Sequence, residues 1–340
     1  MENEKPLVSI ITTAYNSEKW IRTLADSILA QDYPNLEWVV VNDGSTDSTE
    51  SIVFEYRDRF AALKGRTLKV KYIKQANAGL GSATLTGMHN ISGAYFTQID
   101  SDNYYKSGAI TKLYEALSSH PDALFAQADC QGFRIVDGKE VPAIRFSYAY
   151  GIDSDLMNKN EDPLFYFAQE KKAFLFGLWF VDTEKYRQVN PTLLFTPLKK
   201  LQDFQILGQL YASGKKVYVP EVLLMMYFRP GSLSQDSVTD PQTFDETFNA
   251  GRSSIDFLQI PNEQKERAKA FIGFRYAKSV LSETREQRNW PVFRRYLKFV
   301  VSARKSYPVL NSIGQSRSYY YWSYRFYPLR KLIRRFFKKK

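Results

Sequence analysis

Residues 94–103 read Ala94-Tyr95-Phe96-Thr97-Gln98-Ile99-Asp100-Ser101-Asp102-Asn103. The first six predict a short buried strand that ends in two acidic residues one position apart. Because side chains alternate along a strand, Asp100 and Asp102 point to the same side. Converging carboxylates at a strand end form a site for a hard divalent cation such as Mg²⁺ or Mn²⁺, which can neutralise a departing diphosphate. The same residues are also typical of a simple turn.

Strand and helix patterns alternate on both sides of this stretch. Strand patterns cover residues 7–12, 36–41, 68–73 and 94–99, and helical patterns cover residues 17–31, 46–60, 81–90 and 107–118. This alternation predicts an α/β fold, a mostly parallel sheet flanked by helices on both faces. Ligands of such sheets bind beyond the carboxyl ends of the strands. The polar clusters fall there: Thr13-Ala14-Tyr15-Asn16, Asn42-Asp43-Gly44-Ser45, Asn77-Ala78-Gly79 and Asp100-Ser101-Asp102.

The second half of the chain has a looser pattern. Residues 123–128, 132–136 and 216–220 could form strands, residues 202–213 look helical, and residues 150–170 have no clear periodicity and could form a mobile loop. From Asp245 onward the pattern is helical, with few Gly or Pro residues. We therefore expect a first domain over residues 1–235 and a helical region over residues 236–340.

Composition and charge restrict the class of protein. The chain has 340 residues, 44% of them hydrophobic, and no apolar run of the roughly 18 residues that a transmembrane helix needs. The single cysteine, Cys130, excludes an internal disulfide and fits a reducing cytosol. Of the 47 Lys and Arg residues, 15 lie in the last 54 positions, which hold no Asp or Glu. Charge confined to one end argues against a nucleic-acid-binding fold and favours attraction to an anionic surface.

The segment after the second predicted strand reads Asn42-Asp43-Gly44-Ser45-Thr46-Asp47. It is typical of a glycine turn that runs into a helix capped by Ser45 or Thr46. Capping by Ser45 or Thr46 does not use Asp43, so its carboxylate is available for another role. A carboxylate at a strand end can accept a hydrogen bond from the imide N–H of a nucleobase.

Four segments in this order resemble the family 2 glycosyltransferases with the GT-A fold, which is Rossmann-like. They are Thr-Thr-Ala-Tyr-Asn (12–16), Val-Val-Val-Asn-Asp-Gly-Ser-Thr-Asp (39–47), Asn-Ala-Gly-Leu-Gly (77–81) and Ile-Asp-Ser-Asp (99–102). The resemblance covers roughly residues 6–235. It implies a nucleotide-diphospho-sugar donor and inversion at the anomeric carbon.

The resemblance also implies a role for each matching residue in the donor site. Thr13, Ala14 and Tyr15 would line the nucleoside pocket, with the Tyr15 ring available for stacking. Asp43 would read uracil. Asn77 and Gly79 would lie along the nucleoside and diphosphate, and Asp100, Ser101 and Asp102 of the metal motif would also belong to the donor site.

Within this Asp-X-Asp motif, Asp102 is the expected direct ligand of Mn²⁺ or Mg²⁺, with Asp100 beside it. Asn103 stands where many relatives have a third acid, so the metal would be held with less charge. Thr84 stands where relatives often have an arginine, so a common basic contact is missing.

Asp203 matches the position of the family's catalytic base. It would accept the proton of the acceptor hydroxyl as that oxygen attacks the anomeric carbon, an assistance of about 10²–10⁴-fold. From the residues alone, Asp203 also fits an acid at a helix N-terminus that complements the helix dipole. Gln202 replaces the other acid of the family's pair. Gln202 and Trp179 are candidate acceptor contacts, although Trp179 also fits a core residue.

Arg229-Pro230-Gly231-Ser232 is the last cluster with a predicted role. Relatives often have a histidine where this chain has Arg229. Arginine is no ligand for a divalent metal but suits bidentate phosphate contact, so we hypothesise that Arg229 and Ser232 close over the diphosphate. The alternative is a plain Pro-Gly turn.

The C-terminal tail combines an apolar stripe with a basic face. The apolar members recur at helical spacing: Phe326, Leu329, Leu332, Ile333, Phe336 and Phe337. Such a helix is typical of a membrane interface and would suit a lipid-carried acceptor. It could instead dock on the catalytic domain or on a second subunit. Phe293, Tyr296, Leu297 and Val300 form another amphipathic stripe upstream.

These features predict an inverting, metal-dependent glycosyltransferase that moves a sugar from a UDP-sugar to a hydroxyl of a cell-surface glycan or lipid-linked acceptor. We expect the protein in the cytoplasm, peripherally associated with the inner face of the plasma membrane. We expect no nucleic-acid partner, and the sequence leaves a homo-oligomer possible. A nucleotidyltransferase would need a glycine-rich phosphate loop after the first strand, which Thr13-Ala14-Tyr15-Asn16-Ser17 lacks. A catalytically inactive GT-A scaffold is the alternative that keeps the fold.

Overall fold

The computed structural model describes residues 5–145, 178–191, 206, 208–210, 216–228, 249, 252–258, 260–286 and 289–307. The first half alternates strands and helices as predicted: β1 (Val8–Ala14), α1 (Ile21–Leu29), β2 (Asn35–Asp43), α2 (Thr49–Ala61), β3 (Thr67–Gln75), α3 (Leu80–His89), β4 (Tyr95–Gln98), β5 (Tyr104–Tyr105) and α4 (Ala109–Ser118). The second half contains β6 (Phe125–Val136), β7 (Lys139–Arg145), β8 (Leu178–Asp182), α8 (Thr183–Val189), β9 (Lys216–Tyr227), η1 (Ser254–Phe257), α11 (Asn262–Glu286) and α12 (Trp290–Ser306).

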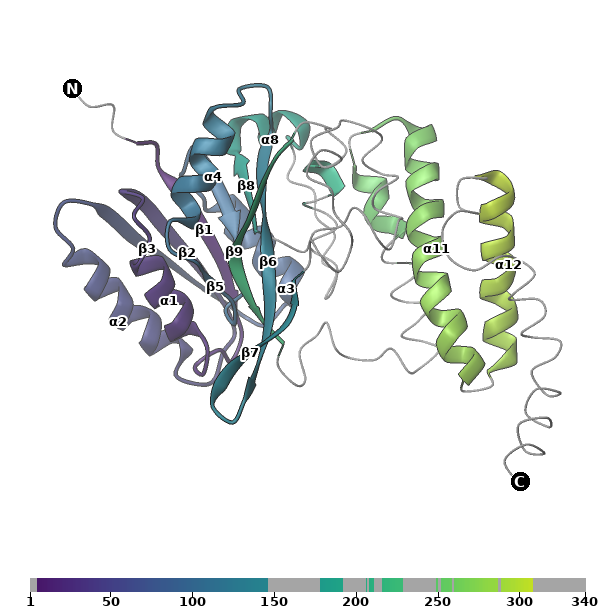
Figure 1. The fold of residues 1–340 in the computed structure, drawn as a ribbon, viewed down its shortest axis with the longest axis horizontal. Helices are drawn as coiled ribbons and strands as arrows, with labels where there is room; N and C mark the ends of the chain where they lie inside the picture. Colours follow the sequence, from purple (N-terminus) through teal and green to yellow (C-terminus); the bar gives the residue numbers. More distant parts are fainter. Residues whose placement is uncertain are drawn as a thin grey trace.

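One twisted sheet organises these elements, in the order β3-β2-β1-β4-β8-β6-β9-β5, with β7 paired to β6 (Figure 1). β1, β2, β3 and β4 are parallel, so the prediction is confirmed for the first half of the chain. The second half is mixed: β8 runs antiparallel to both β4 and β6, whereas β9 runs parallel to β6. The carboxyl ends of the first four strands therefore share one edge of the sheet.

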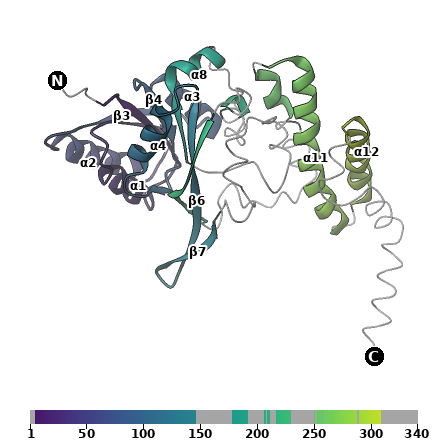
Figure 2. The same cartoon turned by 45° about the horizontal axis from the view of Figure 1, so that its top comes forward.

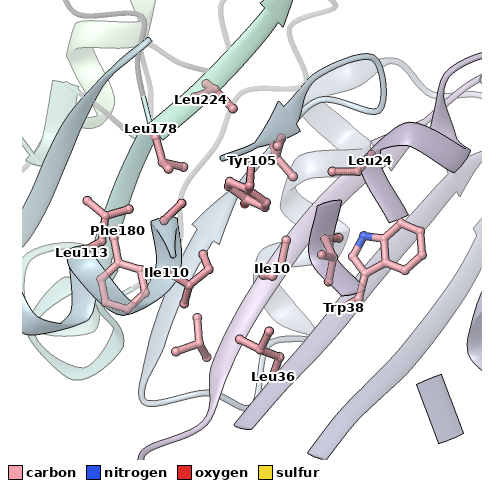
Figure 3. Close-up of a cluster of buried hydrophobic side chains, with 14 of the residues drawn as sticks. Ile10, Leu24, Leu36, Trp38, Tyr105, Ile110, Leu113, Leu178, Phe180 and Leu224 are labelled. Atoms are coloured by element: carbon pink, nitrogen blue, oxygen red, sulfur yellow. The ribbon is translucent and has the colours of Figure 1, made fainter. Parts of the chain in front are cut away.

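Helices cover both faces of the sheet, as the alternating pattern predicted. On one face α1, α2 and α4 pack against alternate residues of the strands, among them Ile10, Leu36 and Trp38 (Figure 3). On the other face α3 and α8 cover Ile11, Val39 and the remaining alternate positions. Both sides of β1 and β2 are buried, so even the polar side chains of these strands, such as Ser9, Thr12 and Glu37, are enclosed.

The two short strands predicted over residues 123–128 and 132–136 form one long strand, β6. The register shifts on either side of Asp129 in the pairing with β9, and between Gly132 and Phe133 in the pairing with β7, where these neighbouring strands contain extra residues. β6 then turns into β7 through Asp137 and Gly138, whose φ angles of 50° and 73° fit a two-residue hairpin turn. Figure 2 shows this hairpin projecting beyond the rest of the sheet.

The C-terminal helices α11 and α12 pack against each other. The upstream stripe on α12 is buried in this contact, with Phe293, Tyr296 and Val300 each 3% exposed or less. This stripe is therefore used for intramolecular packing. No helix in the described part of the chain is long and apolar enough to cross a membrane. The basic tail over residues 324–340 lies outside the described residues.

Candidate active site

The predicted polar clusters lie at one edge of the sheet, because the parallel register brings the strand ends together. Ala14 at the end of β1 is level with Asn42 of β2, and Asp43 is level with Gln75 of β3. On the other side of β1, Ile11 is paired with Gln98, the last residue of β4. The four loops that follow these strands are thus neighbours in space.

The loop after β1 presents one exposed aromatic ring. Tyr15 is 54% exposed, while Thr13 and Ala14 directly before it are buried at 7% and 1%. Asn16 adopts a left-handed φ of 49°. Its backbone N–H donates to Ser45 Oγ at 3.0 Å, and its Oδ1 accepts from the backbone N–H of Thr46 at 2.9 Å. These bonds hold the loop against the one after β2 and leave the Tyr15 ring available for stacking on a planar ligand.

The Asp43 side chain at this edge is 4% exposed and accepts three hydrogen bonds. Its Oδ1 accepts hydrogen bonds from Gln75 Nε2 at 2.8 Å and from the backbone N–H of Ala78 at 2.9 Å. Its Oδ2 accepts from the backbone N–H of Gly79 at 2.9 Å. A carboxylate offers about four acceptor positions. Asp43 therefore orders the Asn77-Ala78-Gly79 loop and keeps about one position for a ligand.

Gln75 and Thr86 hold Asp43 in place through hydrogen bonds, and the sequence motifs predicted neither residue as part of the site. Thr86 Oγ1, on α3, donates to Gln75 Oε1 at 2.7 Å, and the same amide donates through Nε2 to Asp43. The cross-strand register of Asp43 and Gln75 could be found only by pairing β2 with β3 in the right alignment. A strand-end glutamine has no special signal in the sequence.

A close backbone approach also fixes the loop after β3. Gly44 has a φ of 79°, and a Cβ there would lie 2.8 Å from the backbone nitrogen of Asn77. Glycine is thus required at position 44 for two reasons: the backbone is left-handed, and there is no room for a Cβ atom. Asn77 is exposed at this edge and Gly79 is half-buried.

The acidic motif after β4 is tied to the loop after β1. Ser17 and Ser101 share a hydrogen bond of 2.8 Å between their hydroxyl groups. The backbone N–H of Ser17 donates to Thr49 Oγ1 at 2.8 Å, which links the motif to α2 as well. Asp100 is exposed and Asp102 is half-buried. Ser101 therefore fixes the turn in place, and the carboxylates of Asp100 and Asp102 lie on either side of it in the sequence.

The two carboxylates fit a divalent ion that is completed by substrate. Within the described residues no group of three or more His, Cys, Asp or Glu side chains could hold a metal. Mg²⁺ is commonly bound by one or two carboxylates together with substrate phosphates and water, rather than by an all-protein cage. Asp102 and Asp100 match that ligand set. The ion would neutralise charge on a diphosphate when bound.

Asn103 has a structural role in the described chain. It is 6% exposed, and its Oδ1 accepts from the backbone N–H of Tyr227 at 3.1 Å. Tyr227 in turn contacts two aromatic rings, Trp20 at 4.8 Å and Phe133 at 5.2 Å between centroids. The acidic motif, the end of β9 and the strand β6 are thereby joined. This aromatic contact set was not predicted.

The remaining predicted residues have mixed outcomes. Thr84 is fully buried and accepts from Gln98 Nε2 at 3.3 Å, so the arginine position of the family is filled by a core contact. Trp179 is 4% exposed and packs edge-on against Phe96, which favours the core interpretation over acceptor contact. Four residues lie outside the described residues: Gln202, Asp203, Arg229 and Ser232.

Comparison with known proteins agrees with this architecture. A family model described as Glycosyl transferase family 2 matches residues 9–177. Glycosyltransferase GlyA of Streptococcus pneumoniae is 33% identical over 231 residues, which make up 67% of this chain and 31% of that protein. The uncharacterized glycosyltransferase EpsJ of Bacillus subtilis is 38% identical over 110 residues, 32% of this chain and 30% of that protein. The chain thus spans about a third of the length of these relatives.

Two solved structures share the fold. TarS 1-349 of S. aureus, in complex with UDP-GlcNAc, superposes with a TM-score of 0.61 at 21% identity, covering 87% of this chain and 81% of that one. The mannosyltransferase PcManGT of Pyrobaculum calidifontis, in complex with GDP-Man and Mn²⁺, gives a TM-score of 0.55 at 17% identity, covering 88% and 76%. The predicted GT-A fold is confirmed, and the chain belongs to the family 2 glycosyltransferases.

Proposed function

We propose that this protein transfers a sugar from a UDP-sugar to an acceptor hydroxyl with inversion at the anomeric carbon, assisted by a divalent metal. The observation that carries the proposal is the meeting, at one sheet edge, of a buried carboxylate with about one acceptor position left and an anchored pair of acidic side chains. The Asp43 carboxylate suits a nucleobase N–H, and the Asp100–Asp102 pair suits a metal-bound diphosphate.

Each part of the donor would meet a different loop. The uracil imide N–H would donate to Asp43 while the base stacks on Tyr15, and the diphosphate would lie between the Asn77-Ala78-Gly79 loop and the acidic motif. Asp102, with Asp100 beside it, would hold Mn²⁺ or Mg²⁺ on the phosphates. Arg229 and Ser232 belong to this hypothesis as further phosphate contacts.

Asp203 remains the proposed general base. Its carboxylate would accept the proton of the acceptor hydroxyl as the hydroxyl oxygen bonds to the anomeric carbon and the bond to the diphosphate oxygen breaks. Gln202 and Trp179 remain candidate acceptor contacts, although the burial of Trp179 weakens its case. The acceptor we propose is a cell-surface glycan, such as a capsular or wall polysaccharide, or a lipid-linked sugar.

The solved neighbours support a nucleotide-sugar donor and differ in its base. TarS was crystallised with UDP-GlcNAc and PcManGT with GDP-Man and Mn²⁺. At 21% and 17% identity they establish the fold alone. The choice of uracil for this chain therefore rests on Asp43, and the choice of metal on the Asp-X-Asp motif.

We also propose peripheral attachment to the inner face of the plasma membrane. The outer face of α12 is basic, with Arg294, Arg295, Lys298 and Lys305 all exposed, and α12 contains no acidic residue. The same bias continues through the tail to residue 340. Each Lys or Arg near an anionic leaflet contributes about 1 kcal/mol of attraction.

A thermal-shift panel tests the proposed donor. UDP, GDP, dTDP and CDP are each added with and without Mn²⁺, and a ligand at about 100 times its dissociation constant stabilises the folded protein by about 2.7 kcal/mol. We expect the largest rise in melting temperature with UDP, and only when Mn²⁺ is present. No rise with any nucleotide would contradict the enzyme proposal and favour the inactive scaffold. A UDP shift then selects the UDP-sugars for a turnover screen.

A further inference from the structure

We infer that Gln75 determines nucleobase specificity by limiting Asp43 to a single further hydrogen bond. Gln75 occupies one acceptor position of the carboxylate, so the site fits a base with one N–H donor on its pairing edge, such as uracil. A base with two adjacent donors, such as guanine, fits poorly. The inference rests on the proposed function because it requires Asp43 to face the base.

The hydrogen bonds of Asp43 give the number of acceptor positions in use. Oδ1 accepts two bonds, from Gln75 Nε2 at 2.8 Å and from the N–H of Ala78 at 2.9 Å. Oδ2 accepts one, from the N–H of Gly79 at 2.9 Å. Since each carboxylate oxygen has two lone pairs, Oδ1 is full and Oδ2 has one position left.

Gln75 is itself held in a fixed orientation. Its Oε1 accepts a hydrogen bond from Thr86 Oγ1 at 2.7 Å. The carboxylate of Asp43 can only accept hydrogen bonds, so the amide end that faces it is the NH₂ group, and Oε1 is the end that faces the Thr86 hydroxyl. Gln75 is also directly opposite Asp43 in the β2–β3 register. Thr86, Gln75 and Asp43 thus form a chain of hydrogen bonds from α3 to the carboxylate.

The two bases place different demands on a carboxylate. Uracil presents one imide N–H between two carbonyl oxygens, which a single acceptor satisfies. Guanine presents its ring N–H beside an exocyclic amino group, and this pair is matched by both oxygens of a carboxylate at once. With Oδ1 full, the second guanine donor would have no oxygen of the buried Asp43 carboxylate to pair with, a loss of about ten- to a hundredfold in affinity.

A purely structural role is the competing explanation. Asp43 receives the N–H groups of Ala78 and Gly79 at the start of α3, where a negative charge is favourable. Removing Gln75 would then lower stability and affect all ligands alike. The two explanations differ in what they predict for the ratio of UDP to GDP affinity.

The test compares nucleotide affinities of full-length variants by calorimetry in the presence of Mn²⁺. The variants are Gln75→Leu, which removes the amide, and Thr86→Val, which removes only the hydroxyl. We expect the wild type to prefer UDP over GDP at least tenfold, Gln75→Leu to reduce that ratio about tenfold or more, and Thr86→Val to reduce it less. Inorganic pyrophosphate, which has no base, should bind all of them equally.

Two matched controls separate specificity from folding. Thr86→Ser keeps the hydroxyl donor and should retain the wild-type ratio. Gln31→Leu removes another bridging amide, whose Nε2 donates to the carbonyls of Ser27 and Lys106, and should lower stability without changing the ratio. If Gln75→Leu does not fold, Thr86→Val still tests the chain of hydrogen bonds.

The outcomes distinguish this inference from the proposed function. A lower melting temperature with an unchanged UDP-to-GDP ratio in both Gln75→Leu and Thr86→Val would overturn the role of Gln75 and leave the UDP donor intact. A wild type that binds pyrophosphate but does not prefer UDP would contradict the uracil donor itself, and the role of Gln75 with it. A reduced ratio in both variants supports the inference.

Discussion

The side-chain oxygen of Asn103 accepts a hydrogen bond from the backbone N–H of Tyr227 across 3.1 Å. Asn103 directly follows Asp102, and Tyr227 ends β9, two residues before Arg229. The contact thus joins the proposed metal motif to the strand that leads into the proposed phosphate-contacting segment. An amide suits this position, because it accepts the bond without placing a third negative charge in a site that is 6% exposed.

Asn103→Ala should destabilise the protein by about 1–3 kcal/mol, because the part-buried N–H of Tyr227 would lose its acceptor. Urea denaturation measures this loss. Asn35→Ala, which removes a side-chain donor to the carbonyl of Lys5 near the N-terminus, is the peripheral control and should cost less. Equal losses in the two variants would show that the Asn103 contact is no more than a surface hydrogen bond.

Gly44→Ala should be more harmful than Gly65→Ala. Both glycines have left-handed φ angles, 79° and 78°, which cost an alanine about 1–2 kcal/mol. Only at Gly44 would the added Cβ meet a neighbour, the backbone nitrogen of Asn77 at 2.8 Å, whereas nothing lies within 4 Å at Gly65. We expect Gly44→Ala alone to weaken UDP binding, as measured by calorimetry. A matching loss of UDP affinity in Gly65→Ala would indicate a general effect of backbone strain.

Asp102→Asn should abolish the dependence of nucleotide binding on Mn²⁺. An amide is a weaker ligand than a carboxylate, and the ion contributes several kcal/mol to stabilising the leaving diphosphate, so turnover should fall by at least about a hundredfold. Titrating Mn²⁺ against UDP affinity gives the direct readout. Asp137→Asn, in the β6–β7 turn, is the matched control. Full Mn²⁺ dependence in Asp102→Asn would remove this residue from the metal site.

Deletion of residues 324–340 should release the protein from anionic liposomes in a sedimentation assay. The deleted segment carries the apolar stripe and basic face of the tail, and its attraction to the leaflet should fall as salt is raised. Liposomes of neutral lipid are the control and should bind neither form. Unchanged sedimentation with anionic liposomes would locate membrane contact elsewhere or refute it.

The effect of Lys216 on stability should depend on pH. Burial lowers the pKa of its ammonium group from an ordinary 10.5 to about 8. Between these values the unfolded state binds more protons than the folded state, so this residue makes stability rise with pH from about 8 to 10.5, and its full penalty applies below pH 8. Lys216→Met should therefore stabilise the protein more at pH 7 than at pH 10.5. Parallel stability–pH curves for the two proteins would contradict the lowered pKa.

The sequence was sufficient for the first half of the fold. Local strand patterns and helical periodicity predicted β1 to β4 and the helices between them, because the apolar side chains that these strands bury stand close together in the sequence. It was less informative for β6, where Asp129-Cys130-Gln131 interrupts the apolar pattern and gives the appearance of two strands. It also left the mixed pairing of β8 and β9 unpredicted, because the direction and order of neighbouring strands depend on how the chain connects them, which a short run of residues does not show.

By itself, the sequence determined which residue types stand at the strand ends: Asp43, Tyr15 and the Asp100–Asp102 pair follow directly from the alternation of apolar runs and polar turns. Only the tertiary structure decided what these side chains contact. Gln75 reaches Asp43, Thr86 reaches Gln75, and Asn103 reaches Tyr227, across separations of up to 124 residues. Such contacts depend on strand register and loop approach, which short-range patterns do not encode. The physical reason is that hydrogen bonds are satisfied in space, whereas the sequence displays only order along the chain.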